Sequence, residues 1–227
     1  MQCRVGHRSA GLLAQKLKTS TSRAPRRKWE LQPEGATHVR HTTKAIADLT
    51  RDYVIDPAHT RIGFVARHAM VTKVRGSFTE FKGKVHLDEQ NPSASSAQIV
   101  IKVHSIDTSN ADRDRHLRSN EFFAMDQFPE ITFISTATEQ VGDEGFKLTG
   151  DLTVKGATKP VTVDFKYQGS AKDPYGNLRA GFEGKATINR KDFGVTTNLV
   201  LATGGVLVGD LITLELDFSL IRAKNVG

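Results

Sequence analysis

The chain has 227 residues and a mass of 24.9 kDa, which suits one large domain or two small ones and allows a sizeable core. Its 38% hydrophobic and 25% charged residues exclude disorder of the whole chain, and no run of about 18 apolar residues is present to cross a membrane as a helix. Residues 1–44 hold ten Lys and Arg against two Glu, so the net charge of +7 belongs to this segment and a nucleic-acid-binding face is not expected.

The first 50 residues show neither the alternation of a strand nor the stripe of an amphipathic helix. We interpret residues 1–50 as a basic, disordered extension that precedes a folded domain at 51–222. Its only apolar stretch, Leu12–Ala14, is shorter than a signal-peptide core, so we expect a cytoplasmic protein. An organelle transit peptide and a start codon assigned too far upstream are the alternatives. The single cysteine, Cys3, has no partner for an internal disulfide.

From about Asp52 onward, apolar and polar residues alternate with the period of two that is typical of half-buried strands. One face of each segment is apolar and the other is polar, which favours antiparallel pairing over a parallel βαβ arrangement. Turn signals such as Asn91-Pro92 separate the segments. The alternating segments, about eight in number, are 62–66, 83–87, 97–103, 131–135, 146–154, 161–167, 182–188 and 212–220.

Eight such strands predict an all-β fold, either a closed barrel or a sandwich, with one short helix over 111–123. Small residues lie on or beside the apolar faces and leave space that larger side chains would fill. They are Gly63, Gly83, Gly150, Gly184 and Ala186. An eight-stranded barrel can hold one small ligand, so the space indicates a cavity. Glycine in a strand also permits a bend or bulge, and the pattern alone does not separate these two interpretations.

The motifs of common catalytic and nucleotide-binding sites are absent from the sequence, and the eight histidines are scattered. One near-match to a calcium loop is rejected, because Arg115 stands where the tight turn of that loop requires glycine. Its four potential ligands are Asn110, Asp112, Asp114 and Glu121. We expect instead that Asn110 or Asp112 caps the helix and that Asp114 and Glu121 face solvent.

Five ordered blocks of sequence carry a resemblance to a known family. The first is YVIDPAHT at 53–60 with IGF at 62–64 and His68; the others are HLRSNEFF at 116–123 with FPEITF at 128–133, GDLTVKGATKPV at 150–161, INRKDFG at 188–194 and LVGD at 207–210. These blocks resemble the motifs of the YceI-like, polyisoprenoid-binding family from Tyr53 to about Leu220. The chain departs from the family pattern at Ala124, where an Asp is expected, and this puts the capping of that turn in doubt.

The resemblance implies an eight-stranded, antiparallel, extended lipocalin-like barrel with one short helix. It also implies an apolar tunnel that holds a polyisoprenoid, a quinone-like lipid or a similar long-chain amphiphile, and no other cofactor. It thereby favours the cavity interpretation of the small residues. The expected lining is Phe64, Ile101, Phe133, Leu148, Phe165, Phe182 and Leu214. His59 and His68 are candidates for contacts to the head group of the lipid, and no residue is assigned to catalysis or to a metal.

We therefore expect a protein that binds, stores or transports such a lipid without catalysis. One alternative is an enzyme that acts on an isoprenoid-type lipid in the barrel, which would need a buried acid–base pair. Another is a stress-response protein whose barrel is filled by its own side chains. Asp56, Arg118 and Asp192 are expected to have structural roles in turns and caps. The sequence leaves open the identity of the lipid, the pathway and the oligomeric state, a homodimer included.

Overall fold

A computed structural model describes residues 49–201 and 205–224, and the extension expected at residues 1–50 lies almost entirely outside them. These described residues form strands, one α-helix and three short 3-10 turns. The strands are β1 (Arg51–Ile55), β2 (Arg61–His68), β3 (Thr72–Phe78), β4 (Phe81–Leu87), β5 (Ser96–Lys102), β6 (Ile106–Asp107), β7 (Glu130–Val141), β8 (Gly145–Val154), β9 (Ala157–Lys172), β10 (Leu178–Asn189) and β11 (Val208–Arg222). The helix is α1 (Ala111–Arg118), and the 3-10 turns are η1 (Pro92–Ala94), η2 (Val103–Ser105) and η3 (Arg190–Phe193).

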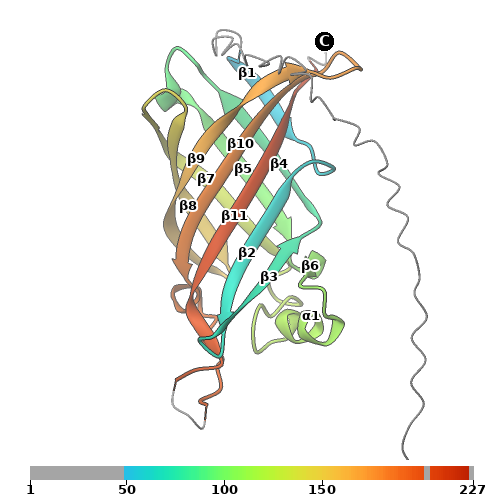
Figure 1. Cartoon of the computed structure of the whole chain (residues 1–227), viewed down its shortest axis with the longest axis vertical. Coiled ribbons are helices and arrows are strands. Elements are labelled where there is room, and N and C mark those ends of the chain that lie inside the picture. The colour runs from blue at the N-terminus through green and yellow to red at the C-terminus, as the bar shows by residue number, and fades with distance from the viewer. Residues whose placement is uncertain (1–48, 202–204, 225–227) are drawn as a thin grey trace, which may run out of the picture. The chain divides into compact units, whose positions relative to one another are not determined.

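Eight of the strands close into a ring, which confirms the predicted antiparallel barrel (Figure 1). The order around the ring is β1-β4-β5-β7-β8-β9-β10-β11, and β1 pairs again with β11. β2 follows β1 in the chain and pairs with a different part of the same strand, β11. β3 then pairs with β2 and leads into β4. Neither β1 nor β3 is among the segments predicted from the sequence, although Val74, Gly76 and Phe78 of β3 alternate with polar residues.

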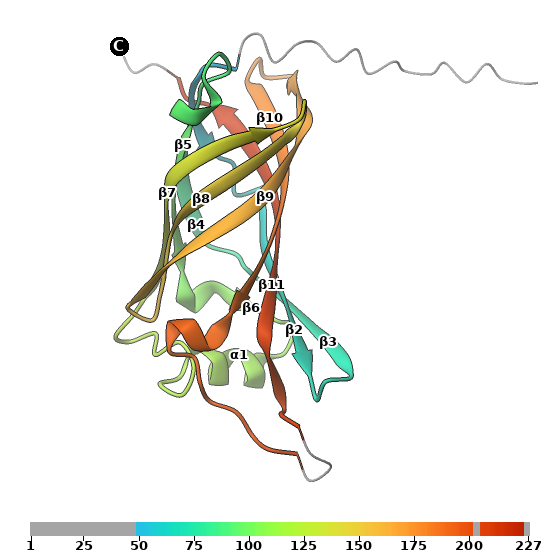
Figure 2. The ribbon, with the colours of Figure 1, turned by 90° about the vertical axis from the view of Figure 1, so that its left-hand side faces the viewer.

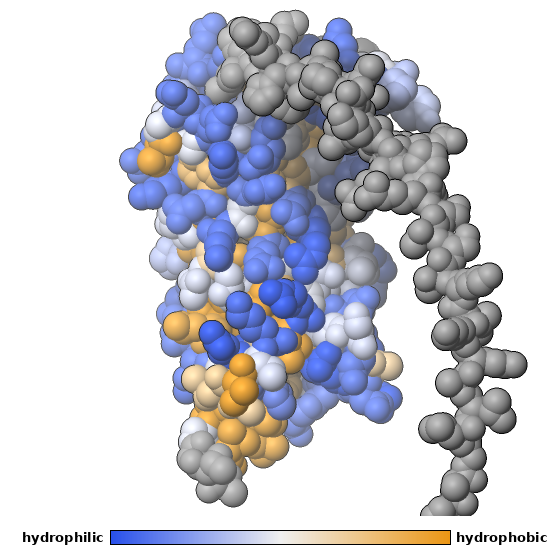
Figure 3. Space-filling model, viewed as in Figure 1, coloured by the Kyte–Doolittle hydropathy of each residue, from blue (hydrophilic) through white to orange (hydrophobic). Residues whose placement is uncertain are grey.

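The strands present apolar side chains to the inside of the barrel and polar side chains to the outside, as the alternation predicts. Figure 3 shows that hydrophilic residues predominate on the visible outer face of the described barrel. A bulge in β7 changes which residues of this strand point inward, because its register with β8 shifts between Ser135 and Ala137. Beyond the bulge, Thr138 and Gln140 stand opposite the inward-facing Leu148 and Phe146 of β8.

Helix α1 lies at the end of the barrel opposite the turn between β9 and β10 (Figure 2). The side chain of Asn110 accepts a hydrogen bond from the backbone N–H of Arg113, so the predicted cap is confirmed. The helix ends at Arg118 rather than at Phe123, because the chain turns after Ser119, whose carbonyl accepts from the N–H of Ala124. Ala124 has a φ of 48°, a left-handed conformation that Asp tolerates better than Ala does.

The expectation that Asp114 faces solvent is wrong. This residue is buried, and its carboxylate accepts hydrogen bonds from the backbone N–H and the hydroxyl of Thr108. Glu121 is exposed as predicted, and it pairs with His116. In the described part of the chain no helix is long and apolar enough to cross a membrane, and no group of three or more His, Cys, Asp or Glu could hold a metal ion.

Candidate functional site

The barrel contains two neighbouring chambers. The upper chamber, toward the β4–β5 loop, has a volume of about 350 Å³, and the lower chamber, toward α1, has a volume of about 200 Å³. Known ligand cavities span about 300–1,000 Å³, so the two chambers together have a size that suits an organic ligand. The side chains that line both chambers form a waist between them; these waist residues are Ile99, Leu148, Phe165 and Phe218.

All seven residues predicted to line a tunnel lie on the walls of these chambers. Phe182 lines the upper chamber, Leu148 and Phe165 belong to the waist, and the lower chamber has Phe64, Ile101, Phe133 and Leu214. Five of the seven are only half-buried although they point into the barrel, namely Phe64, Leu148, Phe165, Phe182 and Leu214. Inward side chains keep accessible surface only where the interior is hollow. The barrel is therefore not filled by its own side chains.

The lower chamber is apolar on every side except at Arg190. This arginine is 5% exposed, and its guanidinium donates hydrogen bonds to the carbonyls of Val195, Thr197 and Gly209 and pairs with Asp210. Because these groups occupy the guanidinium, it holds η3 and the start of β11 together rather than facing a ligand. Three side chains of the α1 region, Leu117, Phe122 and Phe123, complete the wall at this end.

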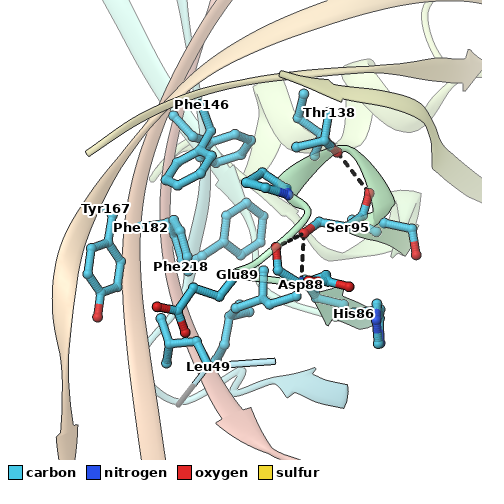
Figure 4. Close-up of a pocket in the computed structure, with 18 of the residues that line it drawn as sticks. Leu49, His86, Asp88, Glu89, Ser95, Thr138, Phe146, Tyr167, Phe182 and Phe218 are labelled. Atoms are coloured by element: carbon cyan, nitrogen blue, oxygen red, sulfur yellow. Dashed lines mark hydrogen bonds between the residues drawn. The ribbon is translucent and has the colours of Figure 1, made fainter. Parts of the chain in front are cut away.

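The upper chamber opens through a polar rim that sequence reasoning missed (Figure 4). Its charged and amide side chains are His86, Asp88, Glu89 and Gln140. The hydroxyl of Thr138 donates a hydrogen bond to the carbonyl of Ser95, which ties β7 to the β4–β5 loop. Part of the rim exists because the β7 bulge turns Thr138 and Gln140 inward, where strict alternation predicts the opposite face, and the sequence carries no signal of that bulge.

The barrel has a cavity, as the favoured interpretation expects, but the inward glycines are not what leaves it open. A Cβ placed on Gly184 would lie 2.3 Å from the ring of Phe165, its partner across the β9–β10 pair. A Cβ on Gly150 would lie 2.5 Å from the ring of Phe133. Each glycine thus accommodates an aromatic ring of a neighbouring strand, and the cavity lies beyond those rings.

Neither histidine proposed for head-group contacts lines a chamber. His59 has a side chain that is 65% exposed, and its Nδ1 lies 2.7 Å from the carboxylate of Asp56. His68 is exposed at the end of β2, where it stands opposite Thr72 and Val208. Both residues belong to the first family block, but neither lies on a chamber wall that the structure describes.

The charged residues expected to have structural roles are placed in turns. The carboxylate of Asp56 accepts hydrogen bonds from Arg179 and His59. These bonds hold the pKa of Asp56 below its ordinary value, and the bond from Arg179 has the largest effect. Arg179 also binds Asp173, whose pKa is lowered to about 2, mainly by hydrogen bonding to the side chain of Asn177. Arg118 donates to the carbonyl of His104, and Asp192 lies exposed in the first turn of η3.

Comparison with known proteins agrees with this architecture. A family model described as "YceI-like domain" matches residues 53–220. The "Protein YceI" of Salmonella newport (strain SL254) is 43% identical over 150 residues, which cover 65% of this chain and 78% of that protein. "UPF0312 protein ECA1782" of Pectobacterium atrosepticum is 42% identical over 165 residues, covering 72% of this chain and 85% of that protein.

Solved structures share the fold. Burkholderia cenocepacia BcnA superposes with a TM-score of 0.64 at 26% identity, and the match covers 74% of this chain and 99% of BcnA. The Campylobacter jejuni YCEI protein gives a TM-score of 0.60 at 28% identity, covering 70% of this chain and 90% of that one. A polyisoprenoid binding domain from Saccharophagus degradans gives a TM-score of 0.59 over 75% of this chain and 98% of that one; at 15% identity it supports the fold alone.

Proposed function

The chain belongs to the YceI-like family, and on that premise we propose that its barrel binds a polyisoprenoid or a similar long-chain amphiphilic lipid, without catalysis, for storage or transport. The observation that carries the proposal is the lower chamber, whose wall offers a ligand only apolar side chains once Arg190 is taken up by its own partners. Each CH₂ group that such a ligand buries contributes about 0.8 kcal/mol. An isoprenoid chain therefore needs no polar contact there.

The two chambers suit the two ends of an amphiphile. The apolar chain would lie in the lower chamber and pass the waist at Leu148 and Phe165, while its head group would lie at the upper rim. Among the described residues of the rim, none is Lys or Arg, and the polar groups include the carboxylates of Asp88 and Glu89 and the amide of Gln140. These groups favour an uncharged hydroxyl or quinone-type head over a phosphate.

Extraction of the purified native protein with organic solvent, followed by mass spectrometry, tests the proposal. We expect a long-chain lipid in stoichiometric amount. A Leu148→Trp variant should fold and lose most of this lipid, because the indole would occupy the waist between the chambers. Ile134→Trp is the matched control, since Ile134 faces outward from β7 and is 50% exposed. Extracts that contain no lipid, or equal lipid in both variants, would contradict the proposal.

A further inference from the structure

Exposed apolar side chains gather at the lower end of the barrel, in the β2–β3 turn and in the loop that leads into β11. We name these four residues the apolar tip: Met70, Val71, Leu199 and Val200. They are 57%, 77%, 65% and 84% exposed, and they make up four of the nine exposed large hydrophobic residues of the described chain. Figure 3 shows the corresponding hydrophobic patch at the lower end. Contiguous apolar patches of this kind mark interaction sites rather than ordinary surface.

The two segments of the tip are joined to each other. The backbone N–H of Ala69 donates to the carbonyl of Leu207, at 2.7 Å, and the N–H of Leu207 donates to the carbonyl of Leu199. Val200 and Val206 form an antiparallel bridge, which makes the loop a second narrow projection beside the β2–β3 turn. Figures 1 and 2 both show these two segments projecting beyond the end of the barrel strands. The tip is therefore convex, with the shape of an inserting element and not of a groove.

The β2–β3 turn carries apolar residues at positions where its backbone conformation favours Asn and Gly. Ala69 and Met70 have φ values of 49° and 60°, and the N–H of Val71 donates to the carbonyl of His68. Two successive positive φ angles are typical of a type I′ turn, in which Asn and Gly are preferred. A strained backbone that carries exposed apolar side chains indicates a functional requirement for those side chains.

The charged side chains within the two segments of the tip have one sign. Arg67, Lys73 and Arg75 are exposed on β2 and β3, and Arg67 stands directly opposite Lys73. None of the three forms an ion pair with another residue of the described chain, and the segments 67–75 and 195–209 contain no Asp or Glu. Like charges in opposed positions repel each other in water, so this arrangement suits contact with an anionic surface.

We propose that the apolar tip docks the protein on an anionic lipid bilayer, with Met70, Val71, Leu199 and Val200 inserted at the interface and Arg67, Lys73 and Arg75 against lipid phosphates. Interfacial binding combines buried apolar area with attraction to anionic lipids in this way. A second copy of the chain is a poorer occupant, because a two-fold interface would set the same cations against each other. The lower chamber adjoins the tip, since Ala66, Val208 and Ile212 line it, so docking would bring the chamber next to the bilayer.

The test uses the full chain with Cys3→Ser and a single new cysteine labelled with an environment-sensitive fluorophore. Val71→Cys places the label on the tip, and Tyr175→Cys places it in the turn between β9 and β10, where Tyr175 is 89% exposed. On vesicles of phosphatidylcholine with phosphatidylglycerol, we expect a blue shift and quenching by spin-labelled lipid for the label at position 71 only. The basic residues 1–44 would attract the whole chain to such vesicles, but that attraction does not insert one label selectively.

Substitutions in the tip sharpen the test. Val200→Asp should weaken vesicle binding about tenfold, Arg67→Gln and Lys73→Gln about fivefold each, and Tyr175→Asp should change nothing. The double change Ala69→Asn/Met70→Gly should raise the thermal midpoint while weakening vesicle binding, which misfolding would not produce. Equal responses at positions 71 and 175 would overturn the proposal. A label at position 71 that is already buried without vesicles, in a way that depends on protein concentration, would instead identify a second copy as the occupant.

Discussion

Two glycines of strand β10 allow a matched test of how the barrel wall is packed. A methyl group added at Gly184 would lie 2.3 Å from the ring of Phe165, whereas one added at Gly181 would meet nothing closer than the Cβ of Gln168, at 3.5 Å. Neither glycine has a positive φ, so the backbone accepts alanine at both positions. The two substitutions remove the same freedom from the unfolded chain and differ only in what the methyl group meets in the folded protein.

The expected effects have opposite signs. Gly181→Ala should stabilise the protein by about 0.4–1 kcal/mol, because it reduces the entropy of the unfolded state without strain. Gly184→Ala should destabilise it by about 1–3 kcal/mol, because the ring of Phe165 must leave its place against β10. For a barrel of this size, the two variants should therefore differ by roughly 3–16 °C in thermal midpoint. The displaced ring would enter the chambers that it lines, so Gly184→Ala should also retain less lipid.

Thermal unfolding by circular dichroism and urea titration measure the difference, and extraction with mass spectrometry measures the bound lipid. Phe165→Leu in the Gly184→Ala background should recover part of the lost stability, because the smaller side chain no longer fills the space over residue 184. Equal midpoints for Gly181→Ala and Gly184→Ala, or no recovery in the double variant, would refute the account of Phe165 as the group that fills this position.

Three further outcomes are expected. Ionised Asp173 has a pKa of about 2 against an ordinary 3.8, so it stabilises the fold above about pH 4 and loses that effect as the pH falls toward 2. An Asp173→Ala variant should therefore show a shallower dependence of thermal midpoint on pH across that interval, and an unchanged slope would contradict this. Asn110→Ala should cost about 1 kcal/mol in urea titration, while Asn110→Gly should cost only a few tenths, because glycine tolerates the cap position. A chain that begins at Lys44 keeps the buried Leu49 and should melt at the same temperature as the full chain; a fall of more than a few degrees would show that residues 1–43 stabilise the barrel.

The sequence by itself determined which side chains face inward. Successive residues of a strand point to opposite faces, so the alternation around Phe64, Phe133 and Leu214 places them on the inside whatever the order of the strands. Eight amphipathic strands can bury those faces in a closed barrel or in a sandwich, and the family blocks supplied the barrel topology. For this reason all seven expected lining residues lie on the walls of the chambers.

Only the tertiary structure decided what depends on neighbours that are distant in the chain. Gly184 leaves no space because Phe165 of another strand lies over it. The bulge in β7 reverses the facing of Thr138 and thereby creates part of the polar rim, although the sequence around it keeps no mark of the change. Strand register, bulges and loop contacts are set by pairing across the sheet, and a local pattern of residues carries the direction of each side chain but not the partner that it meets.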